Sequence, residues 1–235
     1  MQGRKPVIGI VSKPVAYEKE PLWRYDELVD DLRYLMVKNG AIAIGILPTS
    51  NTMEFNDNDD FDTTVLTQEE LDDLYTVIDT CDGIILEGGI SSSAYEMEVA
   101  RYAISHDKPV LGICAGFNNL IRALGGDVKV DPTGKHDVYS KDITHNVRMV
   151  EGTKLHGILG EDNVGVNSIH VMIAHDSDIK EYRITARAED GTVEAIELEG
   201  KKFVMGIKWH PEIMLDINPR MTGIFTEFLK ACKKQ

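Results

Sequence analysis

A cysteine between an apolar run and a helical pattern is the residue of this chain best placed for nucleophilic chemistry. Cys114 follows the run Val110–Ile113, and the helical pattern begins directly after it. Gly112 and Gly116 permit a tight strand-to-helix turn, which is the nucleophile-elbow arrangement with cysteine in place of serine. A helix N-terminus favours a thiolate, and its free N–H groups can bind an oxyanion. The alternative is a small core residue, because free cysteines are often buried.

A histidine and a carboxylate follow a later strand. The strand-like run Phe203–Trp209 leads into His210, Pro211 and Glu212. Alternate residues of an extended chain point the same way, so His210 can face the cysteine while Glu212 reaches its other ring nitrogen. Alone, this tripeptide would indicate a surface turn. Since a nucleophile needs a base and the base needs an orienting partner, the pattern predicts a triad with Cys114.

Two glycines end another buried strand. The run Gly83–Leu86 leads through Glu87 into Gly88 and Gly89. Glycines at the carboxyl edge of a parallel sheet present backbone N–H groups where α/β proteins bind ligands. We assign the N–H groups of Gly89 and Ala115 to an oxyanion hole, with a plain turn as the alternative.

The elements that must position these residues alternate between strand and helix through the first half of the chain. Continuous apolar strands with amphipathic helices between them predict a mostly parallel sheet covered on both faces. From 127 to 209 strand-like segments dominate, which predicts an antiparallel extension in the C-terminal half. We expect one domain over residues 1–235. The predicted strands are Val7–Val11, Ala41–Leu47, Gly83–Leu86 and Pro109–Ile113. Four helices are predicted: one with apolar positions from Tyr25 to Met36, one that begins with a capping box at Thr67, one over Ser93–His106 and one around Ile224–Leu229.

The composition is typical of a globular protein, with 43% hydrophobic and 27% charged residues. A formal net charge of −14 argues against nucleic-acid binding, which requires a basic patch. No apolar run approaches the roughly 18 residues of a spanning helix, and the N-terminus lacks the apolar region of a signal peptide. We therefore expect a cytoplasmic protein with no membrane partner.

Neither the acidic stretch nor the cysteines indicate a metal site. Residues 56–62 resemble a calcium loop, but a phenylalanine and an aspartate stand where a ligand and the turn glycine belong. A solvated acidic loop is expected instead. Cys81, Cys114 and Cys232 are far apart and form no Cys-x-x-Cys pair, so neither a zinc ribbon nor a disulfide framework is predicted.

The motifs together resemble those of the class I glutamine amidotransferase superfamily. They are Leu-Glu-Gly-Gly at 86–89, Leu-Gly-Ile-Cys-Ala-Gly at 111–116 and His-Pro-Glu at 210–212. The chain is most similar to the branch of γ-glutamyl-γ-aminobutyrate hydrolases and γ-glutamyl hydrolases. That branch also has a Pro-x-Ile-Gly-Ile strand, here at 6–10, and an Asn-Ser-x-His segment, here at 167–170.

The resemblance implies a flavodoxin-like three-layer α/β sandwich. It implies that Cys114 is the nucleophile, His210 the base and acid, and Glu212 the orienting carboxylate. The reaction implied is hydrolysis of the γ-glutamyl amide bond of a small conjugate through a thioester, with no metal and no organic cofactor. The resemblance further implies that Asn118, Ser168 and His170 bind the substrate. The alternative for His170 is that it only satisfies a hydrogen bond in the core.

Three departures from the branch pattern concern the substrate. Ala115 replaces an arginine, Phe117-Asn118 replaces Met-Gln, and Val171-Met172 replaces His-Gln. These changes remove polar groups, so we expect a leaving amine with an apolar portion. Two other functions stay open: a glutaminase subunit that passes ammonia to a separate synthase, and a non-catalytic relative that binds a γ-glutamyl metabolite. The sequence also leaves open a homodimer.

Overall fold

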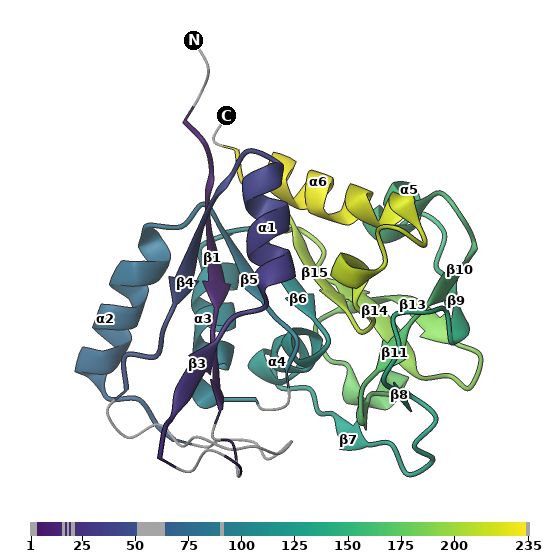
Figure 1. Cartoon of the computed structure of the whole chain (residues 1–235), viewed down its shortest axis with the longest axis horizontal. Coiled ribbons are helices and arrows are strands. Elements are labelled where there is room, and N and C mark those ends of the chain that lie inside the picture. The colour runs from purple at the N-terminus through teal and green to yellow at the C-terminus, as the bar shows by residue number, and fades with distance from the viewer. Residues whose placement is uncertain are drawn as a thin grey trace.

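The computed structural model describes residues 4–15, 17, 19, 22–50, 64–89 and 92–233, so the acidic stretch at 56–62 lies outside the described residues. A nine-stranded sheet forms the centre of the molecule (Figure 1). Five adjacent strands run parallel: β4 (Ile42–Ile46), β1 (Val7–Val11), β5 (Gly83–Leu86), β6 (Val110–Ile113) and β15 (Val204–Ile207). Four antiparallel strands extend it: β14 (Val193–Glu197), β13 (Arg183–Ala188), β9 (His145–Met149) and β10 (Asn163–Val166). The predicted sheet with its antiparallel extension is confirmed.

Helices cover both faces of this sheet, so the fold is a three-layer sandwich as predicted (Figure 1). One layer contains α1 (Asp30–Lys38), α5 (Lys154–Leu159) and α6 (Thr222–Ala231). The other contains α2 (Gln68–Asp79), α3 (Ala94–Ser105) and α4 (Ala115–Ala123). Each layer packs its apolar side chains into a separate buried cluster against the sheet. None of the described helices is long and apolar enough to cross a membrane.

Short strand pairs and turns complete the fold. Two pairs join the segment after α4 to the segment after β10, and they build one wall of the site. These pairs are β8 (Asp137–Val138) with β11 (Ser168–Ile169), and β7 (Lys129–Val130) with β12 (Met172–Ile173). Near the N-terminus β2 (Lys13–Val15) pairs with β3 (Tyr25–Glu27). The 3₁₀ turns are η1 (Asp176–Asp178), η2 (Pro211–Ile213) and η3 (Pro219–Met221).

The first helix begins later than its apolar spacing predicts. Tyr25 lies in β3, opposite Val15, and Val29 has an extended backbone. The N–H group of Val29 donates to a side-chain oxygen of Glu87, the residue after β5, at 2.8 Å. This N–H group is therefore bonded to a side chain and not to a helical carbonyl. The prediction was wrong for this first turn because tertiary pairing overrides periodicity. The capping box at Thr67 is confirmed.

Two glycines let α4 approach the sheet at the end of β6. A Cβ atom on Gly116 would overlap the carbonyl of Leu86, and one on Gly112 would lie 2.7 Å from the carbonyl oxygen of Gly116. The N–H group of Gly116 donates to the carbonyl of Glu87 at 3.1 Å. The first turn of α4 is thus held directly against β5, which fixes the residue before it.

Replacing Gly116 tests this close approach. We expect Gly116→Ala to lower the free energy of unfolding by at least about 2 kcal/mol, because the clash is with backbone that cannot move aside. Gly157→Ala in α5 is the matched control, since a Cβ atom there meets nothing within 4 Å. That change should be neutral or raise stability by up to about 1 kcal/mol. Urea unfolding measures both, and equal stability of the two variants would contradict the packing described.

Candidate active site

Cys114 occupies a strained backbone position between β6 and α4. Its φ of 52° lies in the left-handed region that L-residues rarely adopt, and it is the residue that precedes the first turn of α4. Its N–H group donates to the carbonyl of Ile207 in β15 at 2.9 Å. Such strain persists where the surrounding structure enforces it, often at functional sites. The side chain is buried, with 6% of the residue exposed.

His210 follows the strand next to that of Cys114. The register pairs Ile113 of β6 with Ile207 of β15, so both residues emerge at the carboxyl edge of the sheet. His210 Nδ1 lies 2.6 Å from Glu212 Oε1. Asn167 holds the backbone of His210 from both sides, accepting its N–H at 2.9 Å and donating to its carbonyl at 3.2 Å. The structure thus brings together the three residues predicted as a triad.

The electrostatics favour a thiolate beside an imidazolium. Burial opposes ionisation of the Cys114 thiol. This effect is outweighed by the charge and hydrogen bond of His210 and by the charge of Lys208, so the pKa of the thiol is lowered. Burial likewise opposes protonation of His210. The carboxylate of Glu212 and the sulfur of Cys114 nevertheless raise the pKa of the imidazole well above its ordinary value. Burial raises the pKa of the Cys81 and Cys232 thiols.

A cavity of about 500 Å³ opens beside Cys114. Besides Cys114 and His210, four more of the residues predicted to form the site line it: Gly89, Ala115, Asn118 and His170. Besides His210, its charged lining residues are Arg122, Asp137 and Lys208. Its apolar wall contains Val29, Ile169, Val171 and Met172. A volume of this order is typical of small-molecule sites.

Ser168 lies behind this cavity and is not among its lining residues. It is fully buried, and its hydroxyl donates to the carbonyl of His136 at 2.8 Å. Its oxygen also lies 3.2 Å from His170 Nε2. Burial and the charge of Lys208 lower the pKa of His170 to about 4, so this ring is neutral.

Two buried ionisable residues in or next to the site were missed in the sequence. Lys208 is fully buried, and its Nζ donates to Asn118 Oδ1 at 2.7 Å. A lysine inside the otherwise apolar run 203–209, two residues before His210, is the signal that could have identified it. Glu87 is also buried, and desolvation raises its pKa to about 8.

The charge of Lys208 gives a prediction about thiol reactivity. Iodoacetamide should label Cys114 faster than Cys81 or Cys232, because the thiolate is the nucleophile. Lys208→Met should raise the pKa of Cys114 and slow its labelling near neutral pH roughly tenfold, the effect of one pH unit in pKa. Rates measured by peptide mapping across pH test this.

Lys230→Met is the control for that measurement, because this lysine is exposed on α6. It should leave the labelling rate of Cys114 unchanged. Labelling of Cys232 ahead of Cys114, or equal rates in the two lysine variants, would overturn the electrostatic account.

Curated proteins similar to this chain include amidotransferases and a γ-glutamyl hydrolase. A protein of Schizosaccharomyces pombe, named as a candidate glutamine amidotransferase, is 30% identical over 184 residues, covering 65% of this chain and 70% of its own length. The γ-glutamyl-γ-aminobutyrate hydrolase of Escherichia coli is 29% identical over 58% of this chain and 59% of its own length. The GMP synthase of Aeropyrum pernix is 29% identical over 61% of this chain and 26% of its own length.

Solved structures share the fold over almost the whole chain. A glutamine amidotransferase from Methylobacillus flagellatus superposes with a TM-score of 0.63 at 14% identity, covering 98% of this chain and 96% of its own. The glutaminase domain of the Trypanosoma brucei CTPS gives 0.63 at 16% identity, covering 97% and 94%. Residues 90–212, just over half of the chain, match the family model described as Peptidase C26. The chain therefore belongs to the Peptidase C26 family of class I glutamine amidotransferase-like proteins.

Proposed function

We propose that this chain hydrolyses the γ-glutamyl amide bond of a small conjugate through a thioester on Cys114. One observation carries the proposal: Cys114 lies at a strand-to-helix junction next to a histidine whose Nδ1 is 2.6 Å from Glu212. Family membership supports a glutamine amidotransferase-like hydrolase. The γ-glutamyl substrate and the roles of individual residues are our inference from the site.

In the first half-reaction the thiolate of Cys114 attacks the γ-carbonyl carbon. The N–H groups of Gly89 and Ala115 stabilise the oxyanion, and neither has a hydrogen-bond acceptor within the part of the chain that the structure describes. Protonated His210 gives its proton to the leaving nitrogen as the C–N bond breaks. The products are the free amine and the γ-glutamyl thioester.

Water completes the reaction. His210, now neutral, takes a proton from water, whose oxygen attacks the thioester carbonyl. The C–S bond breaks, glutamate leaves and the thiolate of Cys114 is restored beside an imidazolium. Glu212 orients the ring throughout and stabilises its charged form. This sequence of steps requires no metal and no organic cofactor.

The lining of the cavity fits a zwitterionic acyl group and an amine with an apolar portion. A γ-glutamyl group has an α-carboxylate and an α-ammonium, which Arg122 or Lys208 and Asp137 can complement. Val171 and Met172 offer apolar contact to the leaving amine. The Escherichia coli relative, named for a γ-glutamyl substrate, supports the same class.

A glutaminase subunit that supplies ammonia to a separate synthase is the second candidate. It is favoured by the similarity to a GMP synthase of which this chain covers only 26%. Both candidates use the same thioester chemistry, so the nature of the acceptor and the need for a partner separate them. The non-catalytic alternative is disfavoured by the lowered pKa of the Cys114 thiol.

Substitutions should affect hydrolysis unequally. Cys114→Ala should lower kcat by at least about 10⁴-fold, and His210→Ala nearly as much, because both half-reactions need a proton carrier. Glu212→Gln should retain more activity, since an amide oxygen can still accept from the imidazole. Glutamate release by each purified variant measures this, with Cys81→Ala as the control expected to keep wild-type activity. Comparable rates for wild type and His210→Ala would rule out the proposed triad.

Substrate preference separates the two candidate functions. We expect kcat/KM to be higher for γ-glutamyl conjugates of amines with an apolar portion than for glutamine, since each buried methylene contributes about 0.8 kcal/mol. The measurement uses the purified chain alone with glutamine and a series of γ-glutamyl amides of increasing chain length. A preference for glutamine, or activity only after a synthase is added, would favour the subunit.

A further inference from the structure

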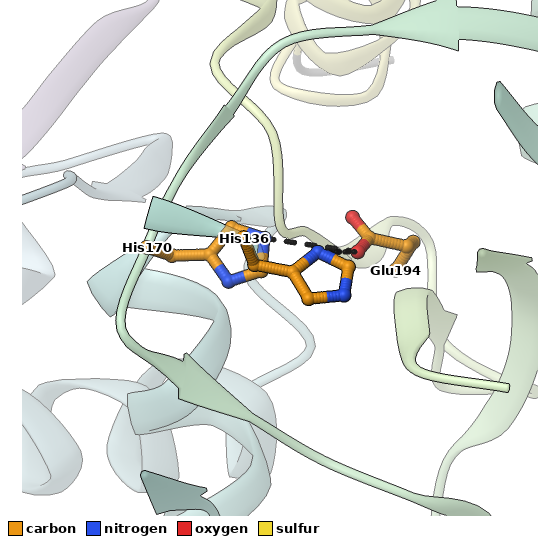
Figure 2. Close-up of side chains that lie close together, drawn as sticks. All are labelled: His136, His170 and Glu194. Atoms are coloured by element: carbon orange, nitrogen blue, oxygen red, sulfur yellow. Dashed lines mark ion pairs between the residues drawn. The ribbon is translucent and has the colours of Figure 1, made fainter. Parts of the chain in front are cut away.

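Behind the wall of the cavity, two histidines converge on a buried carboxylate (Figure 2). His136 Nδ1 and His170 Nε2 each lie 3.7 Å from Glu194 Oε1. The three residues come from the segment before β8, the segment after β11, and β14, and all are buried. The imidazole rings stack with their centroids 4.9 Å apart.

Hydrogen bonds on the outer side of each ring determine that its outer nitrogen carries a hydrogen. His136 Nε2 lies 3.0 Å from a carboxylate oxygen of Asp190, and His170 Nδ1 lies 3.1 Å from the carbonyl of Met172. Both partners can only accept, so these outer nitrogens carry the hydrogens. In the neutral form of each ring, the inner nitrogen then presents a lone pair. Ser168 adds another acceptor, because its hydrogen goes to the carbonyl of His136.

The possible donors nearest to Glu194 among the described residues are ring nitrogens of His136, His145 and His170, all beyond normal hydrogen-bond length. Neither carboxylate oxygen is bonded, and the residue is fully buried. His145 Nε2 lies 3.6 Å from Oε1, beyond hydrogen-bond range. A buried carboxylate requires compensation by a positive charge or by hydrogen-bond donors. The space between His136 Nδ1, His170 Nε2 and Glu194 Oε1 is the place for a cation.

We propose that His136 Nδ1, His170 Nε2 and Glu194 Oε1 bind a divalent transition-metal ion, with Zn²⁺ as the ion best suited to this set. Two imidazoles and one carboxylate form a known type of zinc ligand set. Tetrahedral bonds of about 2.0–2.1 Å place neighbouring ligand atoms about 3.3 Å apart. Here the two nitrogen–oxygen separations are 3.7 Å, and all three ligand atoms lie within 4.8 Å of one another. Asp190 and the carbonyl of Met172 act as the outer partners that usually orient metal-bound histidines.

The ion has a structural role in this proposal and takes no part in the cysteine chemistry. His170 lines the cavity, so an ion on its Nε2 would fix this wall relative to β14. The sequence predicted no metal because the ligands lie at positions 136, 170 and 194, a spacing that matches no short motif. Only the fold brings them together.

Zinc titration of the full chain tests the site. Metal-free protein with Cys114→Ser, which removes the nucleophilic thiolate as a competing ligand, is titrated with ZnCl₂ by calorimetry. We expect one ion per chain and a rise in the thermal midpoint with zinc. Glu194→Gln should weaken binding at least tenfold and abolish that rise. His156→Gln is the matched control, since its imidazole pairs with the exposed Asp162 away from the cluster.

Asp190→Asn keeps the test decisive if Glu194→Gln fails to fold. This side chain is 46% exposed, so its replacement should leave the fold intact. The loss of the carboxylate should weaken zinc binding about 10- to 100-fold with the stoichiometry unchanged. The proposal is overturned if the Cys114→Ser protein binds no zinc, or if its affinity is the same in the Glu194→Gln or Asp190→Asn variant.

Discussion

The parallel pairing of β6 with β15 is the constraint on which the site depends. These strands are far apart in the sequence, and their register sets Ile113 opposite Ile207. The residues that follow them, Cys114 and His210, therefore emerge at one edge of the sheet. A shift of one residue in this register would reverse the side chains of one strand and separate the thiol from the imidazole.

The same edge of an acidic protein places two cations beside the cysteine. The formal net charge is −14, yet buried Lys208 and the protonated form of His210 stabilise the thiolate of Cys114. Local cations in a cleft can reverse the field of the whole surface. The α-carboxylate of the proposed γ-glutamyl substrate can thus be attracted into this cavity although the molecule as a whole repels anions.

The sequence carried most of the information about the framework. Buried strands such as Val7–Val11 and Gly83–Leu86 have continuous apolar runs, and the capping box at Thr67 marks a helix start, so local patterns predicted them correctly. The first helix was predicted too long because Tyr25 has helical spacing but pairs with Val15 in a short ladder. No local pattern reports such a contact.

The elbow and the His-x-Glu segment were recognisable because their members are close in sequence. The residues around them were harder to find, since their proximity depends on strand order. Lys208 reaches Asn118 from another element, and Glu194 of β14 meets His136 and His170 beside the separate pair of β8 with β11. Such long-range clusters become visible only when the fold is known.

The most direct test of the account is to trap the covalent intermediate. Purified protein is mixed with a γ-glutamyl amide, quenched in acid within milliseconds to seconds, and examined by intact-mass and peptide mass spectrometry. The account predicts a γ-glutamyl adduct on the peptide that contains Cys114, removed by hydroxylamine as a thioester should be and absent in Cys114→Ala. Turnover without any adduct on Cys114, or with an adduct on another residue, would contradict it.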